Sequence, residues 1–514
     1  MTYLIGIDLG TSGTKTVLFN RQMEEVASEV FEYPLYQPEN GWAEQMPGDW
    51  WGAATKGIKA VLNASGVDAG AIAGIGLSGQ MHGLVMLDAA GEVLRPAIIW
   101  CDQRTQEQVQ WMEQVIGRES LIAITANPPM TGFTAAKLLW VKQHEPEVFA
   151  RCAHILLPKD YIRFRLTNEY ATDVSDGAGT QLMNIARRSW SEELLGELGI
   201  CASCLPPLHE SVALIAGVSQ TGAGETGLLQ GTPVSAGAAD NAAAAIGTGV
   251  VREGQAFTTL GTSGVVYAVS DKVTIDPLGR VHTLCASVPG KWTVMSCTQA
   301  AGLSLRWLRD TVCQPEVDRA KLEGADPYVI MTQMAEAIEP GADRLIYLPY
   351  LMGERSPHAD PNCRGVFFGL SARHDRRHMI RAVMEGVAFS QAACVDVFRE
   401  MSVPINTMMM TGGGSRSTLW RQMLADLYAC PVSLLEHDQG PALGAAILAG
   451  VGTDVFTSLE AACDSHVHSV DRILPRQAMK AVYRPAYELY KSLYPLLKPA
   501  FDQLAQGLEQ SEGC

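Results

Sequence analysis

Short apolar runs and amphipathic stretches follow one another along the whole chain. Apolar runs rich in β-branched or long side chains predict strands at residues 72–77 and 405–410. Apolar positions spaced three and four residues apart predict helices at residues 47–64 and 377–400. The remaining elements expected from the same patterns are strands at 83–87 and 96–100 and helices at 104–116, 303–309 and 417–427. Alternating strands and helices indicate an α/β protein built from layers.

The pentapeptide LGTSG occurs twice, at residues 9–13 and 260–264, each time between two apolar segments. Because β-branched and aromatic residues flank both copies, each is predicted to turn a β-hairpin rather than to open a helix. The repeat predicts two equivalent halves, with domains at residues 1–248 and 249–514. A largely helical stretch at 477–504, interrupted by three prolines, is expected to pack back onto either half, the first domain included.

The composition narrows the possible partners. The 514 residues include 39 Lys and Arg against 55 Asp and Glu, a net charge of −16 that opposes binding to nucleic acid. No apolar run reaches the length that spans a bilayer, and residues 1–8 lack the basic start of a signal peptide, so a cytoplasmic protein is expected. Cys201 and Cys204 form a single CxxC without the second pair that a zinc site requires.

Both LGTSG turns offer backbone N–H groups and hydroxyls that suit phosphate oxygens. The residues of these predicted phosphate sites are Gly10, Thr11, Ser12, Gly261, Thr262 and Ser263. In the first copy, Asp8 precedes the turn and Lys15 follows it, and these residues suit Mg²⁺ and a phosphate charge, respectively. The alternative is two ordinary glycine-rich hairpins, and the matched pair argues against it.

Asp240 is a lone carboxylate inside the apolar run 234–246. Burying an unpaired carboxylate is costly, so its position indicates a partner, a metal or a catalytic task, and a general base is the predicted task. An N-cap for a helix that starts at Asn241 is the alternative, and it is compatible with catalysis.

Two further motifs concern the ligands. The glycine-rich segment 412–417 follows a strand and opens a helix, which suits a nucleotide, although strand-to-helix joints often use glycine. Residues 74–79 fit GxGxxG, yet another strand follows them, so a dinucleotide fingerprint is not predicted.

His82, Trp100 and Asp102 lie at predicted strand ends, where α/β sheets place ligands, so together they are candidates to bind a sugar. Taken singly, a turn residue at His82 and a core residue at Trp100 are the alternatives.

These motifs together resemble the FGGY carbohydrate kinases, members of the actin, Hsp70 and sugar kinase superfold. The resemblance covers nearly the whole chain and rests on both phosphate turns, on the segment 412–417, and on 132–140 and 365–370, which are similar to the two family signatures. It implies an α/β protein with two actin-like (ribonuclease H-like) domains and a cleft between them.

The resemblance also implies a reaction, the transfer of phosphate from ATP to D-xylulose with Mg²⁺. Gln80-Met81-His82-Gly83 is similar to the D-xylulose-specific members, at a position where glycerol kinases carry Arg-Glu. The residues implied for sugar binding are Gln80, Met81, His82, Trp100, Asp102 and Asn241. Those implied for ATP include Thr262, Gly302, Gly413 and Ser417, and Asp8 and Asp240 are the expected metal ligands. A homodimer is expected from the family alone.

Several alternatives to D-xylulose phosphorylation stay open at this point. Gluconate kinases of the family share the Met-His pair, and L-xylulose or ribulose are further possible substrates. A non-catalytic sugar-binding regulator on the same fold would lose the base or the phosphate residues, yet Asp8 and Asp240 are both present. A chaperone-like ATPase would need a peptide-binding domain, and nothing in the sequence resembles one.

Overall fold

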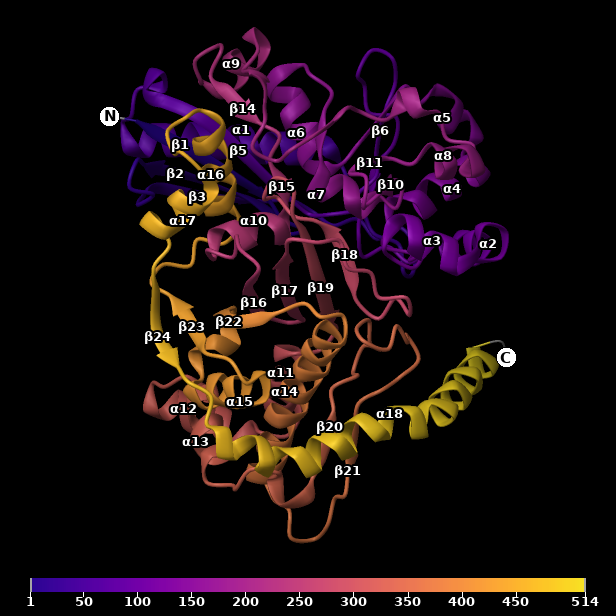
Figure 1. Cartoon of the computed structure of the whole chain (residues 1–514), viewed down its shortest axis with the longest axis vertical. Helices are drawn as coiled ribbons and strands as arrows, with labels where there is room; N and C mark the ends of the chain where they lie inside the picture. Colours follow the sequence, from indigo (N-terminus) through magenta and orange to yellow (C-terminus); the bar gives the residue numbers. More distant parts are fainter. Residues whose placement is uncertain (1, 513–514) are drawn as a thin grey trace. The chain divides into compact units, whose positions relative to one another are not determined.

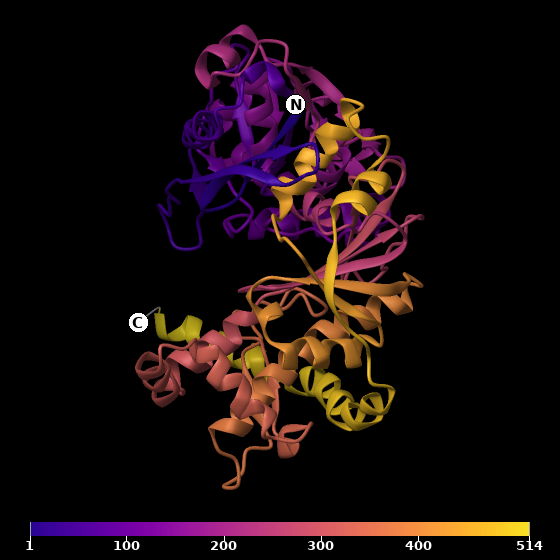
Figure 2. The same cartoon turned by 90° about the vertical axis from the view of Figure 1, so that its left-hand side faces the viewer.

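The computed structural model describes residues 2–512, with side chains through residue 506. The chain forms two compact units (Figure 1). Unit 1 holds the chain up to residue 252 together with 269–293 and 437–468, and unit 2 holds 253–268, 294–436 and the chain from 469 onward. Each unit therefore gathers segments that lie far apart in the sequence. Figure 2 shows this for unit 1, where the segment 437–468, coloured orange to yellow, lies beside the indigo N-terminal strands.

The main sheet of unit 1 has the strand order β13-β14-β5-β1-β2-β3, and β15 also pairs with β5. Its strands are β1 (Tyr3–Leu9), β2 (Gly13–Asn20), β3 (Glu25–Glu32), β5 (Ile72–Gly79), β13 (Leu214–Gly217), β14 (Pro233–Ser235) and β15 (Ala238–Ala239). β1 and β2 are antiparallel, whereas β1, β14 and β15 each run parallel to β5. The carboxyl ends of β1, β5 and β15 therefore meet at one edge of the sheet.

The two faces of this sheet differ because successive side chains of a strand point to opposite faces. Ile5, Ile7 and Leu9 belong to a buried apolar cluster that also contains Trp50 and Ile58 of α1 (Pro47–Ser65). On strands β1 and β5, Gly6 and Gly76 are register partners, and a Cβ on either would come within 2.0 Å of a backbone oxygen of α16 (Pro441–Gly452). These glycines let α16 pack directly on the backbone of the sheet, as its position in Figure 1 shows.

Further elements surround this core of unit 1. Its other helices are α2 (Gln106–Met112), the π-helical η2 (Glu113–Gly117), α3 (Arg118–Thr125), α4 (Thr134–His144), α5 (Pro146–Arg151), α6 (Pro158–Thr167), α7 (Val174–Gly177), η3 (Ala178–Thr180), α8 (Glu192–Leu198), α9 (Gln220–Thr226), α10 (Asp240–Gly247) and α17 (Leu459–His466). Its short strands include β4 (Glu44–Gln45), β6 (Val85–Leu87), β7 (Ala97–Ile98), β8 (His154–Leu156), β9 (Thr172–Asp173), β10 (Met183–Asn184), β11 (Ser189–Trp190), β12 (Leu208–His209) and β18 (His282–Cys285).

In unit 2 the strands lie in the order β19-β17-β16-β22-β23-β24. These are β16 (Gly254–Leu260), β17 (Gly264–Ser270), β19 (Trp292–Thr298), β22 (Ile405–Thr411), β23 (Val432–Leu435) and β24 (Ser469–Ile473), and β20 (Ile346–Leu348) pairs with β21 (Val366–Phe368) elsewhere in the unit. The helices of unit 2 are α11 (Gly302–Thr311), α12 (Gln314–Glu323), α13 (Pro327–Glu336), α14 (Arg376–Glu400), α15 (Thr418–Tyr428) and α18 (Gln477–Glu512).

Both predicted hairpins are confirmed. β1 and β2 are antiparallel around the first LGTSG turn, and β16 and β17 are antiparallel around the second. The predicted helix at 47–64 is α1, the one at 377–400 is α14, and the GxGxxG segment lies in strand β5, as expected. The helix predicted at 104–116 starts two residues later and changes to a π-helical turn after Met112.

The C-terminal helix departs from the prediction. The three prolines were expected to interrupt it, yet α18 continues through Pro485, Pro495 and Pro499. It lies in unit 2, where the Tyr483 hydroxyl accepts a hydrogen bond from Arg381 of α14 and the Tyr490 hydroxyl contacts that of Tyr350 at 3.0 Å. An interior proline costs a helix about 3 kcal/mol, and we attribute the continuity of α18 to packing of this kind along its buried face.

Candidate active site

The site in unit 1 forms where β1, β5 and β15 end. Across the sheet, Asp8 is the register partner of Ser78, and Ser78 is that of Ala238. Asp240 follows β15 directly and is the first residue of α10. In an α/β sheet, ligands bind at the carboxyl ends of parallel strands. The topology thus brings two of the predicted acidic residues to the edge where a ligand is expected.

Asp8 lies on the same face of β1 as Gly6. Its Oδ1 accepts a hydrogen bond from the Ser78 hydroxyl at 3.1 Å, and Lys15 is its register partner on β2. Burial raises the pKa of Asp8 to about 6, while Ser78 and the charge of Lys15 oppose that rise. The Lys15 ammonium donates to Oε1 of Gln439 at 3.0 Å, so side chains from both ends of the chain meet beside this turn.

Asp240 is held by its own helix. Its Oδ1 accepts hydrogen bonds from the backbone N–H of Asn241 at 2.6 Å and from Nδ2 of Asn241 at 2.9 Å. Burial and the negative charge of Asp8 raise the pKa of Asp240 to about 7, while the hydrogen bonds from Asn241 oppose that rise. The alternative that Asp240 is an N-cap is corrected, because the helix begins at Asp240 itself and Ala239 occupies the cap position.

Met81 and His82 lie next to this pair. Nδ2 of Asn241 is 3.9 Å from the Met81 sulfur. His82 has φ +67, the left-handed conformation, and its Nδ1 lies 2.7 Å from the carbonyl oxygen of Gly179, so Nδ1 carries the proton. The ring also packs edge-on against Phe133, with centroids 4.7 Å apart. The His82 carbonyl oxygen accepts from the buried Lys137 ammonium at 2.9 Å.

Three other predicted sugar residues take different positions. Trp100 is 36% exposed and its indole N–H donates to Oγ1 of Thr11 at 2.9 Å, which links it to the first turn. Asp102 is fully buried, accepts from the Ala43 N–H at 2.6 Å and pairs with Arg104 at 2.7 Å. Both of its oxygens are occupied, so the predicted direct contact of Asp102 with a sugar is corrected to a structural role.

Gln80 is linked to the first LGTSG turn through Gln45. Its side chain is almost fully buried, and its Nε2 donates to Oε1 of Gln45 at 2.8 Å. Gln45 in turn donates to the carbonyl oxygen of Thr11 at 2.7 Å. The Oε1 of Gln80 is buried and has no hydrogen-bond partner among the described residues, so its sugar contact stays a prediction.

In unit 2, the second LGTSG turn is held by backbone groups. The N–H of Gly302 donates to the carbonyl oxygen of Gly261 at 2.8 Å, and the N–H of Leu303 donates to that of Thr262 at 3.1 Å. A Cβ at position 302 would lie 2.4 Å from the Gly261 oxygen, so this close approach requires glycine. The start of α11 is therefore fixed against the turn.

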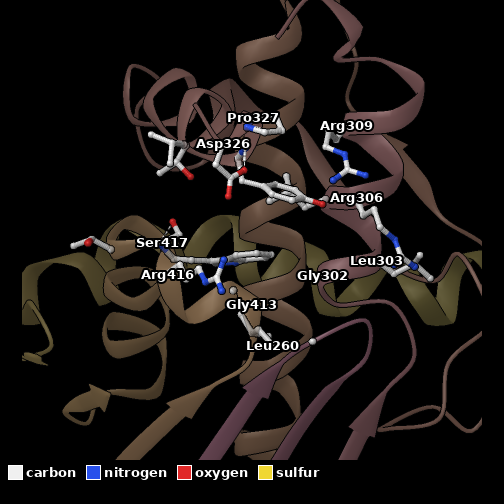
Figure 3. A pocket seen from close by; sticks show the side chains of 18 of the residues that line it. Leu260, Gly302, Leu303, Arg306, Arg309, Asp326, Pro327, Gly413, Arg416 and Ser417 are labelled. Carbon is white, nitrogen blue, oxygen red and sulfur yellow. Dashed lines mark hydrogen bonds between the residues drawn. The ribbon is translucent and has the colours of Figure 1, made fainter. Parts of the chain in front are cut away.

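A pocket of about 810 Å³ opens beside this turn. Its lining includes Thr262, Gly302, Gly413 and Ser417, four of the predicted nucleotide residues. Figure 3 shows Gly413, Arg416 and Ser417 on one side of the pocket, with Asp326 and Pro327 across from them. Ser417 also caps α15, where its hydroxyl accepts from the N–H of Trp420 at 3.2 Å.

The electrostatic character of this pocket suits a polyanion. Arg306, Arg309 and Arg416 line it, and the Arg309 guanidinium lies 5.0 Å from the centroid of the Tyr328 ring. Exposed backbone N–H groups at glycine turns and arginine side chains are the groups that bind phosphate oxygens, and an aromatic ring offers a face to a base. The pocket can therefore hold a nucleoside polyphosphate.

Comparison with known proteins agrees with this geometry. Residues 3–247 match the model of the N-terminal domain of the FGGY family of carbohydrate kinases, and residues 256–453 match the model of its C-terminal domain. The chain belongs to the FGGY family of carbohydrate kinases. The two-domain FGGY fold predicted from the sequence is confirmed.

Individual FGGY relatives cover almost the whole chain. Xylulose kinase of Bacillus subtilis is 41% identical over 96% of this chain and 97% of its own length. Gluconokinase of the same organism is 31% identical over 98% of both chains. The crystal structure of xylulose kinase from Rhodospirillum rubrum superimposes with a TM-score of 0.90 at 31% identity, covering 97% of this chain and all of that one.

The structure of this FGGY kinase also shows functional candidates that the sequence left unmarked. Ser78 supports Asp8, and only its strand register indicates this, since a serine in an apolar strand carries no motif. Asp326 and Tyr328 line the pocket beside Gly302 from the start of α13, and no sequence pattern links them to the second turn. Lys137, which contacts His82, lies in the segment 132–140. The similarity of this segment to a family signature is the signal that could have marked it.

Neither a metal-binding cluster nor a membrane-spanning helix is found in the part of the chain that the structure describes. Within residues 2–512, no group of three or more His, Cys, Asp or Glu side chains is placed to hold a metal ion. No helix in that range combines the length and the apolar character needed to cross a membrane. Cys201 and Cys204 are both free thiols.

Proposed function

We propose that this FGGY kinase transfers the γ-phosphoryl group of ATP to D-xylulose and yields D-xylulose 5-phosphate. The observation that carries the proposal is the meeting of Asp8, Asp240 and the Met81-His82 pair at one sheet edge of a chain 41% identical to a xylulose kinase. The family supports ATP as the phosphate donor. The pocket beside Gly302 supports the nucleotide site in unit 2.

Asp240 is the proposed general base. A base must accept the proton of the attacking hydroxyl within hydrogen-bond reach, about 2.6 to 3.2 Å. Asp240 is partly exposed at the sheet edge, and Asn241 holds one of its carboxylate oxygens in place. Asn241, Met81 and His82 would bind the sugar hydroxyls and the carbon skeleton beside it. The proton on Nδ1 of His82 is committed to Gly179, which orients the ring.

The residues present also fit Mg²⁺. This ion is bound in kinases through one or two carboxylates plus phosphate oxygens and water, and Asp8 and Asp240 interact electrostatically at the sheet edge. Asp8 would hold the ion, and Asp240 would be its second carboxylate. When bound, Mg²⁺ neutralises charge on the transferring phosphoryl group. Thr11, Ser12 and Lys15 would bind the phosphate oxygens from the first turn.

One experiment tests the substrate and the base together. ADP release with Mg-ATP is measured for D-xylulose, L-xylulose, D-ribulose, L-ribulose, D-gluconate and glycerol, with Asp240→Ala as control. We expect the highest kcat/KM on D-xylulose and a loss of about 10²-fold or more in the variant, the lower end of what a general base contributes. Wild-type turnover in Asp240→Ala would remove the residue from the base role.

D-gluconate is the second candidate substrate, favoured by the 31% identity to a gluconokinase over nearly the whole chain. A higher kcat/KM on gluconate than on xylulose would keep the kinase mechanism and reassign the sugar pocket. ADP release that no sugar stimulates would contradict sugar phosphorylation and favour the non-catalytic regulator.

A further inference from the structure

Unit 1 contains a cluster of ionisable side chains that the proposed reaction does not use. Lys159, Asp160, Arg163, Asp173 and Asp176 all have fully buried side chains. The Lys159 ammonium lies 2.6 Å from Asp160, 2.9 Å from Asp173 and 3.2 Å from Asp176. The contact with Asp160 is a hydrogen bond, and those with Asp173 and Asp176 are ion pairs. Burying charges is costly unless they are paired, so this cluster needs a structural or functional reason.

Opposite charges face one another in the cluster. Two cations face three carboxylates, but burial and the adjacent Asp160 and Asp173 raise the pKa of Asp176 well above its ordinary value. The Lys159 and Arg163 charges outweigh burial at Asp160 and hold its pKa below the ordinary value. A shift of any member would weaken a buried ion pair, so the network resists displacement.

The cluster is bonded to the backbone just before Asp240. Arg163 donates from Nη1 to the carbonyl oxygen of Ala236 at 2.6 Å. Asp173 accepts from the hydroxyl of Ser175 at 2.5 Å, and the Ser175 oxygen in turn accepts from the N–H of Ala239 at 3.1 Å. Ala239 immediately precedes Asp240. β15 pairs only with β5, so the Ser175 hydroxyl takes the place of a neighbouring strand on its other side.

The same segment also reaches the candidate sugar residue. Ser175 lies on α7, and the following η3 turn carries Gly179, whose carbonyl oxygen is 2.7 Å from Nδ1 of His82. A Cβ on Gly179 would lie 2.6 Å from that nitrogen, so the ring packs directly on the turn. One short segment, residues 173–180, therefore contacts both His82 and the residue before Asp240.

We propose that Ser175 is a positioning residue for Asp240: anchored on the buried cluster through Asp173, it fixes the Ala239 amide and thereby the start of α10. This inference rests on the proposed role of Asp240 as base. A carboxylate misplaced by about 1 Å can lose about 10²-fold in rate. Ser175 acts through the backbone and does not touch the substrate.

The chain offers a matched control in Ser211. Its hydroxyl also donates to Oδ2 of Asp173, at 2.8 Å, and its side chain is as buried as that of Ser175. The Ser211 side chain makes no hydrogen bond to Ala239, which bonds instead to Ser175. Ser175→Ala and Ser211→Ala therefore remove the same kind of bond from the same carboxylate. They differ in the side-chain bond to Ala239, which only Ser175→Ala removes. The Ser211 carbonyl oxygen accepts from the N–H of Gly237 at 3.1 Å, and this backbone bond is retained in Ser211→Ala.

Three measurements on both variants test the inference. The melting temperature should fall by similar amounts. The kcat with D-xylulose should fall about 10-fold or more in Ser175→Ala and less than about 3-fold in Ser211→Ala. The sugar KM should change by a smaller factor than kcat, because His82 keeps its contact with Gly179. Ser175→Thr, which keeps the hydroxyl, should recover part of the lost kcat. Equal kcat losses in the two alanine variants would overturn the positioning role.

Hydrogen exchange separates this inference from the proposed function. The backbone amides of residues 236–241 should exchange faster in Ser175→Ala than in Ser211→Ala, whether or not the sugar is the right one. Equal exchange rates would overturn the inference even in an active enzyme. Faster exchange in Ser175→Ala, combined with no sugar-dependent ADP in the wild type, would contradict the proposed reaction and retain the anchoring of β15 by Ser175.

Discussion

The two LGTSG turns have the same five residues and different surroundings. The first is flanked by Asp8 and Lys15, which are register partners on β1 and β2. At the corresponding positions the second has Thr259 and Val266, so it lacks both charges. The pentapeptide thus forms a glycine-rich hairpin in both units, while the flanking residues give the first turn a carboxylate and an ammonium group that the second lacks.

The contacts of the turns differ as well. Side chains hold the first turn, since Gln45 donates to the carbonyl oxygen of Thr11 and Trp100 donates to the hydroxyl of Thr11. Backbone N–H groups of Gly302 and Leu303 hold the second. The hairpin ladder closes at Leu9 and Thr14 in the first copy and at Leu260 and Gly264 in the second, so the second loop is one residue shorter. We infer that the first turn serves the chemical step and the second serves nucleotide binding.

The largest effect is expected from removing the charge at the first turn. Asp8→Asn should lower kcat about 10²-fold to 10³-fold, as the loss of one group that stabilises the transition state does, and should raise the Mg²⁺ concentration for half-maximal rate. The matched change at the second turn is Thr259→Ser, which keeps the hydroxyl that contacts Thr411 at 2.8 Å. It should alter kcat less than about 3-fold in the same steady-state assay. Equal losses at both positions would remove the difference in role.

An intermediate effect is expected at the second turn. In Gly302→Ala, the new Cβ would meet the Gly261 oxygen, so the start of α11 must move away from the turn. The KM for ATP should rise about 10-fold, the equivalent of one lost hydrogen-bonding contact of about 1.4 kcal/mol, while the sugar KM stays within about 2-fold. Initial rates with each substrate varied in turn measure both values.

Gly413→Ala gives the contrast within the same pocket. A Cβ there has no protein atom within 4 Å, so any rise in the ATP KM would come from the nucleotide itself. A higher sugar KM in Gly302→Ala, with ATP unaffected, would show that the nucleotide does not use this turn.

Local pattern predicted the hairpins and the strand-to-helix joint, because turn chemistry and side-chain alternation act over a few residues. Pattern could not show which polar residues become buried. Asp102 lies beside residues of the site in sequence, but Arg104 and the Ala43 N–H take up its carboxylate oxygens. The continuity of α18 across its prolines was also beyond local rules, because contacts such as that between Tyr490 and Tyr350 are long-range. Likewise, the one-residue difference between the two loops depends on strand register, which identical pentapeptides cannot encode.

The smallest effect is expected from a carboxylate that supports the second turn from behind. Oε1 of Glu354 accepts from the backbone N–H groups of Gln299 and Arg355, both at 2.8 Å. Gln299 lies three residues before Gly302 in the segment that joins β19 to α11. Glu354 is thus the counterpart of Asp8 in a different setting, since it is fully enclosed and bonded only to backbone.

Burial raises the pKa of Glu354 from 4.5 to about 8, so between those values the folded state holds a proton that the unfolded state has lost. Stability should therefore fall as pH rises from about 4.5 through about 8. Glu354→Gln keeps the oxygen acceptor and cannot ionise, so its melting temperature should change less than that of the wild type between pH 6 and pH 9. The ATP KM at pH 7 should stay within about 2-fold, because protonated glutamate and glutamine have nearly the same shape. An equal loss of melting temperature in both proteins over this range would show that folding does not raise the pKa of Glu354.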